Sequence, residues 1–234
     1  MARTATLLEL KTQARQRADQ VNSTFVSDAE LTSYINASAT ELYDLLVTSY
    51  ETYYLTSQNV TVVSGTDTYA LPTTFYKLKG IDFNPINPPV GQSAITLMPY
   101  NFNERNRFVY TPAFNIVGLN SFKYSVQGSN IKFIPVPSQG GTIVIWFIPY
   151  LGKMVLDTDT LDGINGWEEY VVVDAAIKMM QKEESDPQAL MIQKEALKKR
   201  IEQSAPSRDA GFPKRMSDVR RANPFGIPGY GQWR

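Results

Sequence analysis

The run Thr142–Ile148, TIVIWFI, consists entirely of β-branched and aromatic residues. These residue types are enriched in strands, and a run without a polar face is typical of a strand that is covered on both sides. The turn-forming sequence Ser138–Gly141 comes directly before it. The sequence therefore predicts a central strand here, with further strands paired to its edges.

Shorter runs with a period of two indicate the other strands of this sheet. Two pairs of runs predict two hairpins: Val60–Val63 with Thr68–Leu71 across Ser64–Asp67, and Phe122–Val126 with Ile131–Ile134 across Gln127–Asn130. Phe75–Phe83 predicts a further strand, and Ile95–Met98 predicts a short strand or the start of a helical turn. Short strands between turns are typical of an antiparallel sheet or a small sandwich.

Helical spacing precedes the strands. One stripe of apolar residues, spaced three or four positions apart, predicts a first helix: Leu7, Leu10, Ala14, Ala18 and Val21. Ser27 with Glu30 three residues later matches a capping box, so we expect a second helix from there to about Leu55. Three tyrosines end this helix: Tyr50, Tyr53 and Tyr54. They could stack on nucleic-acid bases, but we favour core or interface packing, which is the commoner role of such residues.

Helical spacing also follows the strands. A third helix is predicted from about Trp167 to Glu184. Asp186 as a cap, followed by Pro187, predicts the start of a fourth helix that ends near Ser204. Its basic residues are expected on the solvated face: Lys194, Lys198, Lys199 and Arg200.

The order helix, helix, sheet, helix, helix predicts an α+β protein. Residues 1–57 and 152–205 are expected to form an antiparallel helical bundle built from both ends of the chain. Residues 58–151 are expected to form an inserted antiparallel β-sheet or sandwich subdomain, and residues 206–234 an extended C-terminal arm.

The composition excludes several kinds of chemistry. The 234 residues include no cysteine and no histidine, so disulfides, thiolate or imidazole metal ligands and histidine-based catalysis are excluded. No apolar run approaches the roughly 18 residues that span a bilayer, and the N-terminus lacks the apolar segment of a signal peptide. We therefore expect a protein made in a cytoplasm, without a membrane partner and without a cofactor.

Carboxylates are the remaining candidates for a catalytic or metal site. The neighbours Glu168 and Glu169 point about 100° apart on a helix, so they do not converge on one substrate, and the same holds for Glu183 and Glu184. Asp157, Asp159 and Glu168 have the spacing of three calcium ligands. Leu161 stands where that loop needs an oxygen ligand, and Asp162 stands where it needs glycine. We predict neither a catalytic nor a metal site.

The arm, Pro206–Arg234, differs in composition from the rest of the chain. It holds six basic and two acidic residues, so residues 1–205 carry a net charge of −4 in a chain that is neutral overall. Its four prolines prevent a continuous helix, and its four aromatic residues are more than a merely solvated tail would hold. We therefore predict that the arm docks on a partner protein; nucleic-acid binding and simple disorder remain open as alternatives. Its candidate binding residues are Phe212, Lys214, Arg215, Met216, Val219, Arg220, Arg221, Phe225, Tyr230 and Trp233.

Five short motifs, in this order and spacing, carry a family resemblance. They are SDAEL at Ser27–Leu31, YALP at Tyr69–Pro72 with Phe75 and Lys77, IKFIP at Ile131–Pro135, WEEY at Trp167–Tyr170, and PKRMSDVR at Pro213–Arg220. With these motifs the chain resembles the head-to-tail adaptor (connector) proteins of short-tailed bacteriophages.

The resemblance implies a structural virion protein rather than an enzyme. Such adaptors form a ring, commonly of twelve copies, in the virion neck, and they are assembled in the host cytoplasm. The ring continues the channel for double-stranded DNA without sequence-specific binding. The arm would dock on the portal protein, and the opposite side would receive the tail or nozzle protein. The alternative is a DNA-binding module that uses the basic, aromatic arm.

Overall fold

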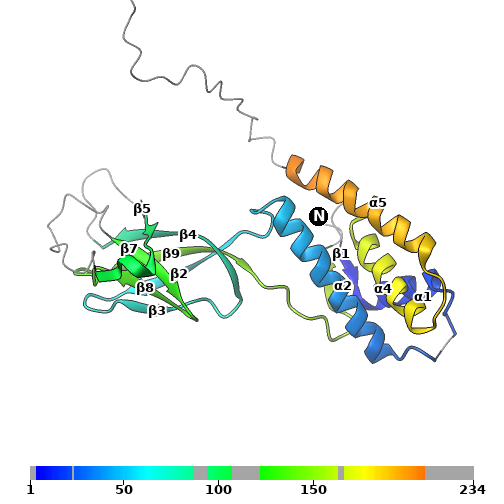
Figure 1. Ribbon diagram of the computed structural model, residues 1–234. Coiled ribbons are helices and arrows are strands. Elements are labelled where there is room, and N and C mark those ends of the chain that lie inside the picture. The colour runs from blue at the N-terminus through cyan, green and yellow to red at the C-terminus, as the bar shows by residue number, and fades with distance from the viewer. Residues whose placement is uncertain (1–3, 23, 87–93, 107–121, 163–165, 209–234) are drawn as a thin grey trace, which may run out of the picture.

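The structure is a computed structural model that describes residues 4–22, 24–86, 94–106, 122–162 and 166–208. Helices gather at one end of the molecule and two four-stranded sheets at the other (Figure 1). The predicted α+β class is confirmed. The helices are α1 (Leu7–Arg17), α2 (Asp28–Ser49), α4 (Glu168–Lys182) and α5 (Gln188–Ser204), with short 3-10 helices η1 (Phe102–Glu104) and η4 (Ala205–Arg208).

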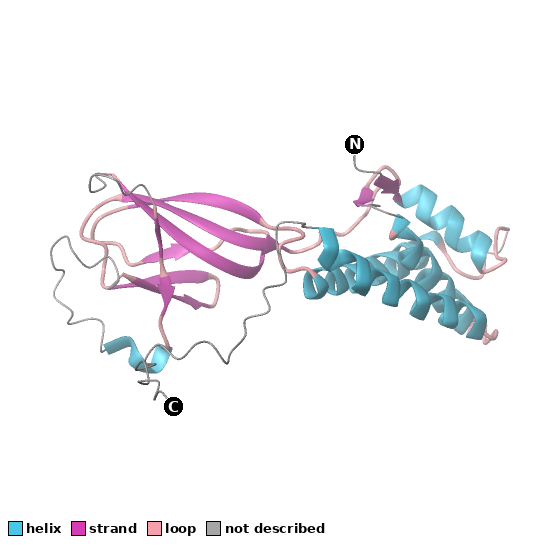
Figure 2. Ribbon diagram, turned by 90° about the horizontal axis from the view of Figure 1, so that it is seen from above, coloured by secondary structure: helices cyan, strands magenta, loops and turns pink. Residues whose placement is uncertain are grey.

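The described strands form three sheets. The strands are β1 (Thr4–Thr6), β2 (Thr56–Val62), β3 (Thr68–Ala70), β4 (Phe75–Pro85), β5 (Ile95–Thr96), β6 (Met98–Pro99), β7 (Lys123–Gln127), β8 (Asn130–Ile134), β9 (Gly141–Pro149) and β10 (Thr160–Asp162). Two sheets have the orders β2-β9-β4-β5 and β3-β8-β7-β6, and β1 pairs with β10 beside the helices. We call the helices with β1 and β10 the helical part, and strands β2 to β9 the β part (Figure 2).

Helix α4 is the centre of the helical part, because it packs against α1, α2 and α5. Its residues from Tyr170 to Ile177 are all buried. A helix that is apolar around most of its circumference must be covered on several sides. The other three helices supply that cover, so segments from both ends of the chain share one core.

The first helix ends earlier than its apolar stripe suggested. Thr6 and Glu9 form a capping box at the start of α1, with hydrogen bonds of 2.8 and 3.2 Å. Leu7, Leu10, Ala14 and Ala18 are buried as predicted, but Val21 is 59% exposed. The backbone turns at Asp19, whose φ is +54°, so the stripe does not continue to Val21.

The second helix differs from its prediction at both ends. Ser27 accepts a hydrogen bond from the Glu30 N–H, but the Glu30 carboxylate binds Lys182 and the Tyr34 hydroxyl instead of returning to the cap. The predicted capping box is therefore only half formed. Helix α2 ends at Ser49 rather than near Leu55.

Strands β1 and β10 were not predicted, because three residues are too few for a periodic pattern. Ala5 pairs with Leu161, and the Leu7 N–H donates to the Asp159 carbonyl at 2.8 Å. This pairing fixes the start of the chain to the segment that leads into α4.

The predicted central strand is confirmed, because β9 pairs with β2 on one edge and with β4 on the other. Ile143 and Ile145 are completely buried, and they contribute to a cluster that also includes Ile131 and Phe133 of the other sheet. The β7–β8 hairpin is also confirmed. Strand β6, however, runs parallel to β7, so the sheets are not wholly antiparallel.

The predicted hairpin between Val60–Val63 and Thr68–Leu71 is wrong. Strand β2 pairs with β9 and strand β3 with β8, so the chain passes from one sheet to the other at this turn. The turn is held by the segment before β9: the Gly65 N–H donates to the Pro137 carbonyl at 2.8 Å, and the Ser64 hydroxyl donates to the Ser138 carbonyl at 2.9 Å.

The two parts meet where α2 ends. Tyr43 and Val47 pack against Ile148 of β9, and the Tyr43 hydroxyl donates to the Pro149 carbonyl. Glu51 accepts from Lys77 at 3.2 Å, and also from Lys79, both on β4. The last turns of α2 are thus tied to the β part by apolar contacts, and Glu51, just after the helix, adds charged contacts.

We expect Gly141→Ala to destabilise the β part by about 1–3 kcal/mol, because the added methyl group would overpack a closed site. Its Cβ would lie 2.5 Å from the Asn84 carbonyl oxygen and 2.6 Å from the Phe83 ring. Gly80→Ala is the matched control, since a Cβ there meets nothing within 4 Å. Urea unfolding curves measure both changes. Equal stability of the two variants would contradict the packing described here.

Candidate functional site

The ten predicted arm residues lie outside the described residues, so their prediction stays untested. The structure does describe where the arm begins. Helix α5 runs into η4, and Ile201 and Ala205 are buried against the helical core. The arm therefore starts from a helix end that is held by the core.

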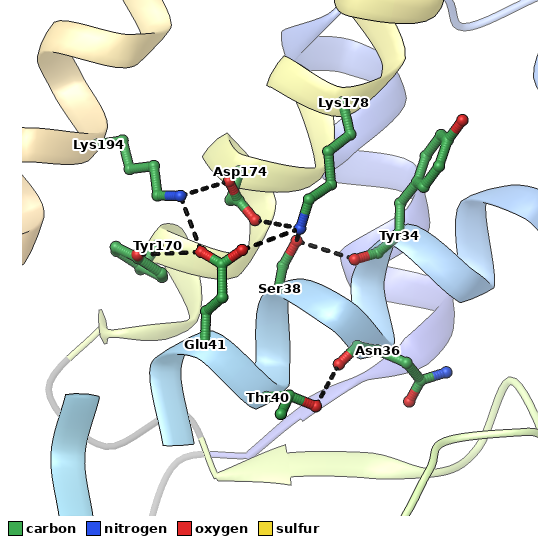
Figure 3. Close-up of polar contacts among 9 residues, drawn as sticks. All are labelled: Tyr34, Asn36, Ser38, Thr40, Glu41, Tyr170, Asp174, Lys178 and Lys194. Atoms are coloured by element: carbon green, nitrogen blue, oxygen red, sulfur yellow. Dashed lines mark hydrogen bonds and ion pairs between the residues drawn. The ribbon is translucent and has the colours of Figure 1, made fainter. Parts of the chain in front are cut away.

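A cluster of charged side chains holds α5 against α2 and α4 (Figure 3). Asp174 of α4 is at its centre and is only 3% exposed. Lys178 Nζ lies 2.6 Å from one oxygen of the Asp174 carboxylate, and Lys194 Nζ of α5 lies 2.7 Å from the other. One buried carboxylate thus joins two helices.

Helix α2 completes this cluster with Ser38 and Glu41. Lys194 Nζ donates to the Glu41 carboxylate at 2.8 Å, and Lys178 Nζ donates to the Ser38 hydroxyl at 3.0 Å. We call Ser38, Glu41, Asp174, Lys178 and Lys194 the Asp174 cluster. The prediction that Lys194 belongs to a solvated face is wrong, because its partners are 20 and 153 residues away in sequence and were not recognisable from its helix.

The Asp174 cluster pairs two carboxylates with two lysine ammonium groups, and these contacts favour the charged forms of Asp174 and Lys194. Burial alone would raise the pKa of Asp174, but hydrogen bonds from Lys178 and Lys194 outweigh it and hold that pKa below its ordinary value of 3.8. Burial opposes the charge of Lys194, yet hydrogen bonds to Asp174 and Glu41 hold its pKa above 10.5. A lysine that stays protonated is neither a nucleophile nor a base, so Lys194 acts here as a charge and hydrogen-bond partner.

The carboxylates considered as catalytic or metal sites do not converge. Glu168 is buried at the start of α4, Glu169 pairs with Arg17, and Glu183 follows the other end of that helix. Asp157 pairs with Lys11 at 2.7 Å, and Asp159 accepts the N–H groups of two neighbouring residues. Within the described segments there is no group of three or more acidic residues that could hold a metal ion.

Tyr53 and Tyr54, which follow α2, face other aromatic rings. The rings of Tyr43 and Tyr54 stack at 4.5 Å between centroids, and Tyr53 lies 4.6 Å from Tyr54 and 5.8 Å from Trp167. Tyr50, Tyr53 and Tyr54 pack against the helical core. Their interpretation as core residues is confirmed, and they form no open platform for bases.

The outward face of α5 was not predicted as a candidate site. Met191 is 49% exposed and Ile192 is 67% exposed, although both are large and apolar. Only the basic residues of this helix were predicted to lie on its solvated face. The signal that could have revealed this face is a second helical stripe beside the inner one: Gln188, Met191, Ile192, Glu195, Ala196 and Lys199.

We expect Lys194→Met to lower the free energy of unfolding by about 1–3 kcal/mol, because Asp174 and Glu41 would each lose a charged donor. Lys199→Met removes an exposed lysine from the same helix and serves as the control, with an expected change within about 0.5 kcal/mol. Urea unfolding of the two variants measures the difference. Equal effects would show that the Asp174 cluster does not hold α5.

The cluster also predicts a pH dependence. Because the pKa of Asp174 is lower in the folded state, its stabilising contribution is present above its ordinary value of 3.8 and is lost as the pH falls through the folded-state pKa. The difference in unfolding free energy between the natural protein and Asp174→Asn should therefore be constant near neutral pH and shrink below about pH 4. Unfolding curves at several pH values test this, and a difference that persists unchanged in acid would contradict it.

Among the helices described, none is both long enough and apolar enough to cross a membrane.

Comparison with known proteins identifies a family whose model matches most of this chain. The family model of the SU10 adaptor protein matches residues 5–222, which takes in all four described α-helices, both four-stranded sheets and the arm as far as Ala222. No curated protein matches the chain. The family consists of structural phage proteins that act in the virion neck with portal and tail proteins. Since the match covers well over half of the sequence, this chain belongs to the SU10 adaptor protein family and is a phage adaptor protein.

Proposed function

We propose that this adaptor forms a ring between the portal and the tail of a short-tailed phage, with twelve copies, as is common in such rings. The ring would continue the channel through which the DNA leaves the head. The observation that carries this proposal is the family match over residues 5–222, because it makes the chain a structural adaptor of the virion neck. The function would be assembly and channel continuity, without a chemical step.

Each copy in the ring would consist of two domains. Residues 1–57 and 152–205 would form a helical bundle that packs copy against copy. Residues 58–151 would form an inserted β-sandwich subdomain. Two separate hydrophobic clusters support this division: one has its buried residues between Ala5 and Leu46 and between Met154 and Ala205, and the other has them between Val62 and Phe147.

The arm would dock on the portal protein. It is basic and aromatic, and it begins at a helix end fixed by Ile201 and Ala205. The family match extends through residue 222, so seven of the ten candidate arm residues lie within the matched range, and Phe225, Tyr230 and Trp233 lie after it. In a ring, the first bound arm raises the effective concentration of the others, so weak single contacts give firm attachment.

Double-stranded DNA would pass through the ring without sequence-specific binding. Residues 1–205 carry a net charge of −4, which disfavours tight binding of a polyanion. The arm carries the compensating +4 and suits an acidic surface on the portal. The alternative, in which the arm binds free DNA, requires affinity that falls steeply with salt and weakens as arm arginines are removed.

A variant that ends at Ala205 should fold but fail to bind isolated portal rings, because the docking arm is absent. A variant that ends at Ala222 keeps the family-matched half of the arm and is the matched comparison, with an intermediate loss. Co-sedimentation with portal rings measures binding, and circular dichroism confirms folding. Normal portal binding by the shorter variant would contradict the docking role. A loss confined to free-DNA binding would support the alternative.

A further inference from the structure

Helix α5 has an outward stripe that no helix of the described chain covers. Its members follow the helical spacing of residues that share one face, and Met191 and Ile192 are its large apolar side chains. We call Gln188, Met191, Ile192, Glu195, Ala196 and Lys199 the α5 ridge; these six side chains form a row that also borders a shallow, open hollow of about 450 Å³. Large apolar residues that remain exposed side by side commonly mark a protein interface.

The ridge is not the face by which α5 packs on the helical core. The inner side of α5 already meets the helical core through Leu190, Leu197 and Ile201, and it meets the Asp174 cluster through Lys194. These contacts fix the rotation of the helix about its axis. Met191 and Ile192 are therefore directed away from the other described helices.

A groove of about 620 Å³ lies between α2 and the segment Lys153–Val155. Two hydrogen bonds fix its wall: Asn36 Nδ2 donates to the Met154 carbonyl at 2.9 Å, and the Met154 N–H donates to Asn36 Oδ1 at 2.8 Å. Val155 is 74% exposed at the rim. The α2 residues that line the groove have short or medium side chains: Ala29, Thr32, Ser33, Asn36, Ala37 and Thr40. We call this the α2 groove.

The α5 ridge and the α2 groove face different sides of the helical part. Figure 3 shows Ser38 and Glu41 of α2 directed toward α4 and α5, whereas Asn36 and Thr40 lie on the other side of α2. The groove thus opens away from α5. Two surfaces that face apart on one chain cannot meet within it, but they can meet between neighbouring copies.

We propose that the α5 ridge of one copy inserts into the α2 groove of the next copy. Met191 and Ile192 would enter the groove over Ser33 and Ala37, and the Glu195 carboxylate would lie beside the Lys153 ammonium group. Residues three and four apart form the ridges that fit the grooves of a neighbouring helix, so the spacing of the two stripes matches. Glu195 of the ridge and Lys153 of the groove rim carry opposite charges and can pair, whereas the basic Lys199 lies at the C-terminal end of the ridge.

A contact between two different surfaces of identical chains is head-to-tail, and its repetition closes a ring when the rotation permits. This inference rests on the proposed ring and specifies which residues build it. It also gives the exposed apolar residues of α5 a partner that is present at high local concentration in any such assembly.

The absence of natural cysteines allows a direct test in assembled particles. The double variant Ile192→Cys with Ala37→Cys replaces the natural chain, and purified particles are oxidised and run on a non-reducing gel. A disulfide forms only where the Cα atoms approach to about 4.4–6.8 Å. We expect a ladder of dimers, trimers and larger species, and a second pair, Met191→Cys with Ser33→Cys, should give the same ladder.

Matched controls separate this contact from random collision. Each single-cysteine variant can form at most a symmetric dimer. Met98→Cys with Ala37→Cys pairs the groove with an apolar position of the β part that is 66% exposed, and it should give no ladder. Charge reversal gives an independent readout: Glu195→Lys and Lys153→Glu should each lower the yield of rings about tenfold or more, and the double reversal should restore it.

The outcomes distinguish this inference from the proposed function. Particles of the natural phage that lack the adaptor in the neck would overturn both. Particles that contain the adaptor in the neck, but show no ladder for either pair and no rescue by double reversal, would overturn the ridge-to-groove contact alone. A ladder from the Met98 control pair of equal strength would also overturn it.

Discussion

The helical part depends on one buried charge. Asp174 lies inside α4, the central helix, and its burial is tolerable only because two lysines neutralise it. One of them, Lys194, comes from α5 and also binds Glu41 of α2. The same contacts therefore join three helices from both ends of the sequence. A buried carboxylate that lost these partners would be strongly destabilising, so the position of α5 is specified more tightly than its few buried apolar residues could achieve.

Helix α5 connects the features that the proposed assembly needs. Its inner face carries Lys194, its outer face carries Met191 and Ile192, and its C-terminal end leads through the buried Ala205 to the arm. If the Asp174 cluster sets the rotation of α5, it also sets the direction of the ridge and the starting point of the arm. The contact between copies and the contact with the portal would then share one structural origin.

Local sequence patterns predicted the elements better than their pairing. The run Thr142–Ile148 and the four helices carry periods that depend only on neighbouring residues, and all were found in the structure. The turn at Ser64–Asp67 has the composition of a hairpin turn, yet its hydrogen bonds go to Pro137 and Ser138. Lys194 was assigned to solvent for the same reason, since its partners are distant in sequence. The arm stood out by composition alone, so its docking role stays a prediction.

The central claim is that this adaptor forms a ring between portal and tail, with its helical parts side by side. A cryo-electron microscopy reconstruction of the virion neck tests it most directly. The account predicts a closed ring of this chain, commonly of twelve copies, in which α5 of each copy contacts α2 of its neighbour and each arm lies on the portal. Finding this chain outside the neck, or in a ring whose copies touch only through their β parts, would contradict it.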